Sequence, residues 1–130
     1  SQDEGFQVAE ALLQQYPDVK GIIAGNDTMA LGAQAAVMAA GMDDIIVVGI
    51  DGSDDAIISI NAGELKATSL QPVAAMALAA AEQADAWVQA GGSTEMEEKQ
   101  SIDMVLITPD NACDYYQFAP VDAGTSPNCQ

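Results

Sequence analysis

The chain has 130 residues, a length typical of one domain, and 49% of them are hydrophobic, so it is able to form a buried core. Twenty acidic residues stand against three lysines, and the sequence contains neither arginine nor histidine. The net charge of −17 repels phosphate backbones and argues against a nucleic-acid partner, and no apolar run reaches the roughly 18 residues that a membrane-spanning helix needs.

Hydrophobic periodicity and the residues that begin or end helices predict alternating helices and strands along the chain. The predicted elements are a helix at 5–15, a strand at 19–24, a helix at 27–40, a strand at 45–50, a helix at 54–61, a strand at 65–70, a helix at 73–90, a strand at 102–108, a short irregular or helical piece after it and a loose tail at 120–130. Gly41 is expected to end the second helix, Ser53 to cap the third and Pro72 to suit the first turn of the fourth.

The order of these elements predicts an α/β fold. The segment IIVVGI at 45–50 is continuously apolar, which is typical of a strand buried on both faces of a parallel sheet. Alternation of helices and strands then favours a doubly wound parallel sheet with helices on both faces and right-handed crossovers.

Polar residues follow three successive strands of this predicted sheet. Asn26 and Asp27 follow the first strand, Asp51 follows the second, and Gln71 follows the third. Because the carboxyl ends of parallel strands meet at one edge of a sheet, and ligands of open α/β sheets bind there, we expect Asn26, Asp51 and Gln71 to form a ligand site.

The residue types at this edge suit a ligand rich in hydroxyl groups. An amide both donates and accepts hydrogen bonds, and a carboxylate accepts from two hydroxyls, so each hydroxyl of a buried sugar or polyol would find a partner. Plainer interpretations stand beside this one: Asp27 as a helix cap, Asp51 with Gly52 as turn residues, and Gln71 as a loop residue. We expect Asp27 to cap its helix and Asn26 to face the ligand.

Other chemistries have little support in the sequence, and no cofactor or metal is expected. Without histidine the usual general base is missing, and there is no glycine-rich phosphate or dinucleotide motif. The segment DGSDD resembles the start of a calcium loop, but glycine stands in its second place and Ala62 in the twelfth. The acidic doublets at 43–44, 54–55 and 97–98 are expected to face solvent.

The two cysteines, Cys113 and Cys129, lie close to the end of the sequence. They do not form a Cys-x-x-Cys pair and no histidine accompanies them, which argues against zinc. In an oxidising compartment they could form a disulfide, and the alternative is two free thiols.

Three segments, IIAGNDTMALGAQAAVMAAG, IIVVGIDGSDDAIISINAGELKATSLQP and AAEQADAWVQAG, resemble the type I periplasmic sugar-binding proteins of ABC transporters, in the ribose-binding branch. The similarity covers about residues 5–118. It implies that Asn26, Asp51 and Gln71 bind a sugar or polyol, with a pentose or a polyol such as xylitol or erythritol as the finer expectation. It also implies a periplasmic or extracytoplasmic location, a membrane permease as partner and no catalysis.

The resemblance further implies a two-lobed fold, of which this chain matches only the C-terminal part. Residues 1–71 would belong to the C-terminal lobe, 72–107 would supply a helix and a strand of the N-terminal lobe, and 108–130 would form the hinge return and tail. We therefore expect a fragment stabilised by the missing N-terminal portion or by self-association.

A second family remains an alternative: the effector-binding core of a lactose-repressor-type regulator has this fold and a similar ND…ALGA pattern. The segment NAGELKATSLQP is more similar to the transport proteins, and the late cysteines and acidity also favour an exported protein. An α/β enzyme fragment is the least supported class, because no nucleophile or base constellation is present.

Overall fold

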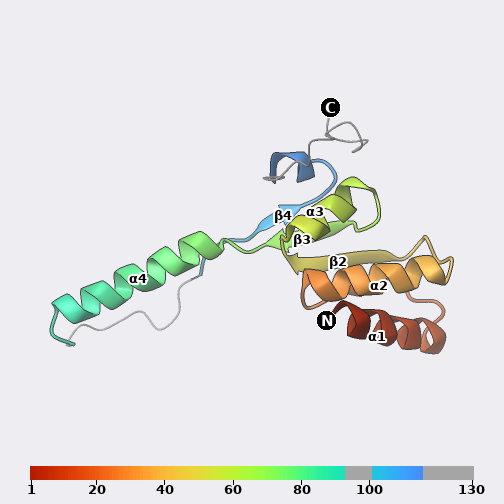
Figure 1. Cartoon of the computed structure of the whole chain (residues 1–130), viewed down its shortest axis with the longest axis horizontal. Helices are drawn as coiled ribbons and strands as arrows, with labels where there is room; N and C mark the ends of the chain where they lie inside the picture. Colours follow the sequence, from red (N-terminus) through yellow and green to blue (C-terminus); the bar gives the residue numbers. More distant parts are fainter. Residues whose placement is uncertain (93–100, 116–130) are drawn as a thin grey trace. The chain divides into compact units, whose positions relative to one another are not determined.

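The structure is a computed structural model that describes residues 1–92 and 101–115 (Figure 1). Its elements are α1 (Gln2–Gln15), β1 (Gly21–Ile23), α2 (Asp27–Ala39), β2 (Ile46–Asp51), α3 (Asp54–Asn61), β3 (Ala67–Leu70), α4 (Val73–Gln89), β4 (Val105–Ile107) and the 3₁₀ helix η1 (Ala112–Tyr115). The chain divides into two compact units, Ser1–Leu70 with Leu106–Gln130, and Gln71–Val105. The predicted helices and strands are all present, with ends that differ by a few residues. The predicted tail at 120–130 lies outside the described residues.

The strands form one sheet in the order β1-β2-β3-β4. The pairs β1–β2 and β2–β3 are parallel, with Ile23 opposite Val48 and Asp51 opposite Leu70. The predicted α/β class with a parallel sheet is therefore confirmed.

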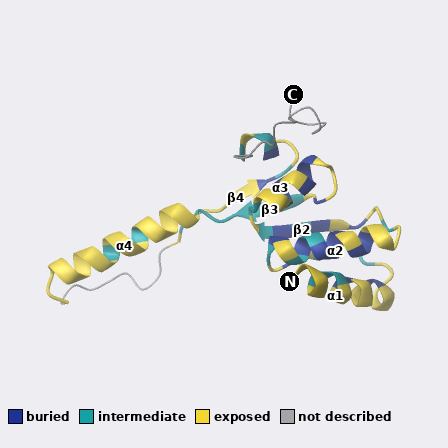
Figure 2. Ribbon diagram, viewed as in Figure 1, coloured by how far each residue is buried: buried dark blue, intermediate teal, exposed yellow. Residues whose placement is uncertain are grey.

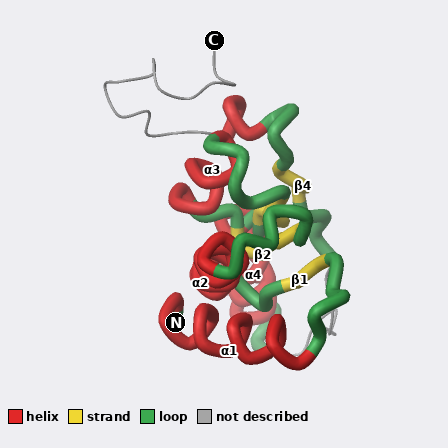
Figure 3. Tube along the Cα trace, turned by 90° about the vertical axis from the view of Figure 1, so that its right-hand side faces the viewer, coloured by secondary structure: helices red, strands yellow, loops and turns green. Residues whose placement is uncertain are grey.

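Helices α2 and α3 lie on the same side of the strands (Figure 3). Val47, on the side of β2 that faces these helices, is fully buried, whereas Ile46 on the other side is 50% exposed and Ile23 of β1 is 81% exposed. Helices on both faces were expected. Because β1, β2 and β3 follow one another in space as in sequence, two right-handed crossovers in the same direction place both helices on one face of the described sheet.

Helices α1 and α2 pack with their backbones in close contact, and glycines make this possible. A Cβ atom at Gly32 would overlap the carbonyl oxygen of Gln2, and one at Gly5 would overlap the backbone of Met29. At the start of α1, the Ser1 hydroxyl accepts a hydrogen bond from the Glu4 amide, which explains why this helix begins before the predicted residue 5.

The hydrophobic core lies between the sheet and the helices of the first unit (Figure 2). Its fully buried members come from α2, β2, α3 and the segments after α3 and within β4 and η1: Ala30, Val37, Val47, Ala56, Ile57, Ile60, Leu65, Ile107 and Ala112. Helix α4, in the second unit, has no buried residue, and Val73 and Trp87 are exposed. Within residues 71–92 and 101–105, the described part of the second unit, no side chain is buried.

We predict that Gly32→Ala lowers the free energy of unfolding by about 1–3 kcal/mol, because the new methyl group overlaps backbone atoms of α1 that cannot move as a flexible side chain would. The roughly 1 kcal/mol that alanine adds to helix propensity would only partly offset this loss. Urea denaturation followed by circular dichroism measures the change. Gly21→Ala is the control, since its Cβ would meet only the Ile46 carbonyl at 3.4 Å. Equal stability of the two variants would contradict the prediction.

Candidate functional site

The polar residues predicted to form a ligand site lie at the carboxyl ends of β1, β2 and β3. Asn26 lies just beyond β1, and Asp51 is the last residue of β2. Gln71 directly follows Leu70, the residue of β3 that pairs with Asp51. Gln71 is also the first residue of the second unit, so its place beside Asn26 and Asp51 stays a prediction.

Asn26, not Asp27, caps helix α2. The Oδ1 atom of Asn26 accepts a hydrogen bond of 2.9 Å from the Met29 amide. The expectation that Asp27 is the cap was therefore wrong. The cap uses only Oδ1, so the Nδ2 group of this half-buried residue is a donor that the capping bond does not use.

Asp27 is buried instead, with 1% of its surface exposed. Its Oδ2 atom accepts a hydrogen bond of 2.6 Å from the Ser53 amide, and its Oδ1 atom accepts one of 2.6 Å from the Thr68 hydroxyl. Gly49 leaves the space that this carboxylate occupies, because a Cβ there would overlap Oδ1. This role of Asp27 was not predicted from the sequence. The signal for it was that Asn26 and Asp27 are consecutive residues of types that cap helices, and only one of them can be the N-cap.

Asp51 has an unusual backbone conformation. Its φ angle is 123°, and no other non-glycine residue in ranges 1–92 and 101–115 has a positive φ. An L-residue in this region is strained by about 1–3 kcal/mol, and such strain is concentrated at functional sites. The Asp51 side chain is exposed at the sheet edge.

The residues after Asp51 are fixed by hydrogen bonds. The Gly52 amide donates to the Thr68 hydroxyl at 3.2 Å, and Gly52 itself has a φ of 75°. The Ser53 hydroxyl accepts from the Ala56 amide at 3.3 Å, so Ser53 caps α3 as predicted. The turn at 51–53 is thereby held to both α3 and β3.

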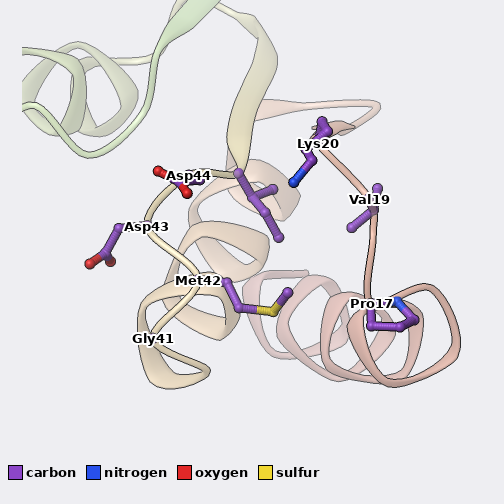
Figure 4. Close-up of a pocket in the computed structure, with 8 residues that line it drawn as sticks. Pro17, Val19, Lys20, Gly41, Met42, Asp43 and Asp44 are labelled. Carbon is purple, nitrogen blue, oxygen red and sulfur yellow. The ribbon is translucent and has the colours of Figure 1, made fainter.

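A pocket of about 390 Å³ lies at the amino-terminal ends of β1 and β2, opposite the strand ends that carry Asn26 and Asp51 (Figure 4). It is lined by residues that precede β1 and β2, namely Pro17, Val19, Lys20, Gly41, Met42, Asp43, Asp44 and Ile45. Asp43 and Asp44 are exposed, as expected for a solvated acidic doublet, and so are Asp54 and Asp55; residues 97–98 lie outside the described residues. This pocket is separate from the strand-end residues.

Among the described side chains, no group of three or more His, Cys, Asp and Glu residues could hold a metal ion. Within the same part of the chain, no helix is both long and apolar enough to cross a bilayer.

Cys113 is disulfide-bonded, and the Oδ1 atom of Asn61 lies 3.7 Å from its sulfur. Cys129, the other cysteine of the sequence, lies outside the described residues. The disulfide interpretation is thus favoured over two free thiols.

A family model described as a periplasmic binding protein domain matches residues 1–93. The chain therefore belongs to the periplasmic binding protein family, as the sequence motifs predicted. A D-apiose import binding protein from Paraburkholderia graminis is 52% identical over 119 residues, which cover 92% of this chain and 38% of that relative. The ribose import binding protein of Escherichia coli (strain K12) is 46% identical over 68 residues, which cover 52% of this chain and 23% of that relative.

Solved structures of this class have the same fold. A solute-binding protein from Bacillus halodurans with bound myo-inositol superimposes with a TM-score of 0.73 at 32% identity, covering 89% of this chain and 39% of that one. A periplasmic solute-binding protein from Actinobacillus succinogenes with bound D-allose gives 0.77 at 28% identity, covering 88% and 40%. The chain thus spans about two fifths of these proteins.

We predict that Asp51→Gly is more stable than Asp51→Ala by about 0.5–2 kcal/mol. Both variants lack the carboxylate, but only glycine adopts a φ of 123° without strain. Parallel urea titrations would measure the difference. If the two variants unfold at the same urea concentration, the backbone at Asp51 is not strained.

We predict that the intact mass rises by two hydrogen atoms on reduction, because Cys113 is disulfide-bonded and the sequence offers only Cys129 as an intramolecular partner. Mass spectrometry with and without reductant tests this. Cys113→Ser is the control and should show no such change. An unchanged mass of the parent chain would contradict the bridge.

Proposed function

We propose that this chain is part of the solute-binding component of an ABC importer, and that the component binds a sugar or polyol of pentose-like size. The observation that supports this most directly is the presence of Asn26 and Asp51 at the ends of two adjacent parallel strands, with Asp51 in a strained conformation. The import binding proteins and sugar-bound structures similar to this chain support the same class of ligand.

The proposed recognition uses the hydrogen-bonding capacity of three side chains. The Asp51 carboxylate would accept from a pair of ligand hydroxyls, and the Asn26 Nδ2 group would donate to a ligand oxygen while its Oδ1 caps α2. Gln71 would both donate and accept. A ligand that lacks one of these hydroxyls would leave a buried group unpaired, which makes the site selective.

The proposed protein performs no chemical reaction. It would close on its ligand by a hinge movement between two lobes and deliver the ligand to a membrane permease on the outer side of the cytoplasmic membrane. Residues 1–71 would lie in the C-terminal lobe, 72–107 would complete the N-terminal lobe, and 108–130 would return through the hinge. The relatives described above are import proteins, which favours this function over a lactose-repressor-type regulator.

Exposed apolar side chains support an association of this chain with further protein. Ile23 and Ile46 are exposed on one face of the sheet, and Val73, Leu78 and Val88 are exposed on α4. Burial of such side chains stabilises a protein by about 1.5–3 kcal/mol each. The missing N-terminal portion or a second copy would supply the covering surface.

We predict that Asn26→Ser lowers sugar affinity while it preserves stability. Serine caps helices as well as asparagine does, so the bond to the Met29 amide has a replacement, whereas the Nδ2 donor is lost. Isothermal titration calorimetry on the complete protein that contains this chain would use D-apiose, D-ribose, D-allose, myo-inositol, xylitol and erythritol. The ligand that the parent protein binds should bind about 5–150-fold more weakly to Asn26→Ser and to Asp51→Ala.

Asp54→Asn is the matched control, since Asp54 is an exposed acid three residues beyond Asp51, and it should bind as the parent protein does. Unchanged affinity in Asp51→Ala would refute its proposed role. Asn26 would be a helix cap alone if Asn26→Ser bound as tightly as the parent. If the parent bound none of these compounds, the proposed ligand class would be wrong.

A further inference from the structure

The buried carboxylate of Asp27 connects three segments that are far apart in the sequence. It belongs to the first turn of α2, directly after Asn26, and it accepts hydrogen bonds from Ser53 after β2 and from Thr68 within β3. Asp27 and Thr68 are each 1% exposed. One side chain therefore joins the start of α2, the turn after β2 and the middle of β3.

These hydrogen bonds fix the backbone amides of the two residues that follow Asp51, namely Gly52 and Ser53. The Ser53 amide donates directly to Asp27, and the Gly52 amide donates to the Thr68 hydroxyl, which in turn donates to Asp27. Such a chain of hydrogen bonds strengthens each member, because every donor is polarised by the next acceptor. Two successive amides are thus turned toward the protein interior.

This arrangement gives a physical reason for the strained φ of 123° at Asp51. A backbone in that region persists only where the surrounding structure holds it, and the two inward-facing amides of Gly52 and Ser53 hold it here. If Asp27 did not accept the Ser53 hydrogen bond, the turn could relax to a conformation that suits aspartate. The Asp51 carboxylate would then leave its position at the sheet edge.

We propose that Asp27 is a positioning residue: without touching the ligand, it holds the Asp51 turn and the adjacent Asn26 in the geometry that binds it. The inference rests on the proposed sugar-binding function. A carboxylate suits this role because both of its oxygens accept, one from a backbone amide and one from a hydroxyl. The amide of asparagine offers one acceptor oxygen only.

The test uses the complete protein with two groups of variants. Asp27→Asn keeps the shape of the side chain but removes one acceptor. Thr68→Val removes the hydroxyl that links Gly52 to Asp27, and Thr68→Ser restores it, so this pair remains informative even if Asp27→Asn does not fold. Ile60→Val is the control for lost stability, because Ile60 is fully buried in the core and makes none of these hydrogen bonds.

Calorimetry should show that Asp27→Asn and Thr68→Val bind the parent protein's ligand at least about tenfold more weakly. Thr68→Ser and Ile60→Val should bind within about threefold of the parent, since about threefold is well under 1 kcal/mol. Affinity in Asp27→Asn and Thr68→Val that matches the parent, or that falls no more than in Ile60→Val, would overturn the proposal.

Amide hydrogen exchange of the ligand-free protein gives a second measurement that needs no sugar. In Asp27→Asn the Ser53 amide should exchange at least about tenfold faster, while the Val47 and Gly49 amides in β2 keep their rates. An unchanged Ser53 rate would overturn the positioning role by itself. A parent protein that binds no sugar or polyol would instead refute the proposed function, and the exchange data would still show whether Asp27 holds the turn.

Discussion

The conformation of the chain at the carboxyl ends of the strands depends on the buried carboxylate of Asp27. A carboxylate taken out of water is costly unless hydrogen bonds replace those it loses, and here the Ser53 amide and the Thr68 hydroxyl replace them at 2.6 Å each. Position 49 has room only for glycine, since a Cβ atom there would overlap the Oδ1 atom of Asp27. The turn at 51–53, the start of α2 and the middle of β3 therefore adopt mutually dependent conformations.

The first unit combines close packing with exposed apolar surface, and helix α4 of the second unit also exposes apolar side chains. Small residues let α1 and α2 approach until a methyl group at Gly32 would overlap the facing backbone. On α2, Ala30 is fully buried, and its methyl group would lie 3.1 Å from a Cβ atom at Gly49 of β2. The other face of the sheet exposes Ile23, and α4 has no buried residue. The chain spans about two fifths of the solved proteins to which it is similar. Large exposed apolar patches mark sites of interaction with other protein, membranes or ligands, and the proposed function assigns these surfaces to association with further protein.

The fold could be predicted from the sequence because its signals are local. A continuous, mostly β-branched run indicates a parallel strand, and Ser53 before an apolar helix indicates a cap, so the bounds of β2 and α3 were predicted closely. The expectation that β2 is buried on both faces was wrong, because Ile46 is 50% exposed on the face that α2 and α3 do not cover. The first helix begins earlier than predicted because the Ser1–Glu4 capping box extends it. The one-sided cover of the described sheet was not anticipated, since it depends on the spatial order of β1, β2 and β3.

The candidate site, too, could be predicted from the sequence only in part. By itself, the sequence determined which residues follow each strand and that Asn26, Asp51 and Gln71 carry the groups that a hydroxyl-rich ligand requires. It did not determine which of Asn26 and Asp27 caps α2, because both side chains are able to cap. Only the tertiary structure decided this: the partners of Asp27 lie 26 and 41 residues away, and they become neighbours only when three strands pair in parallel. The strained backbone of Asp51 has the same origin, since local preference opposes it and long-range hydrogen bonds hold it.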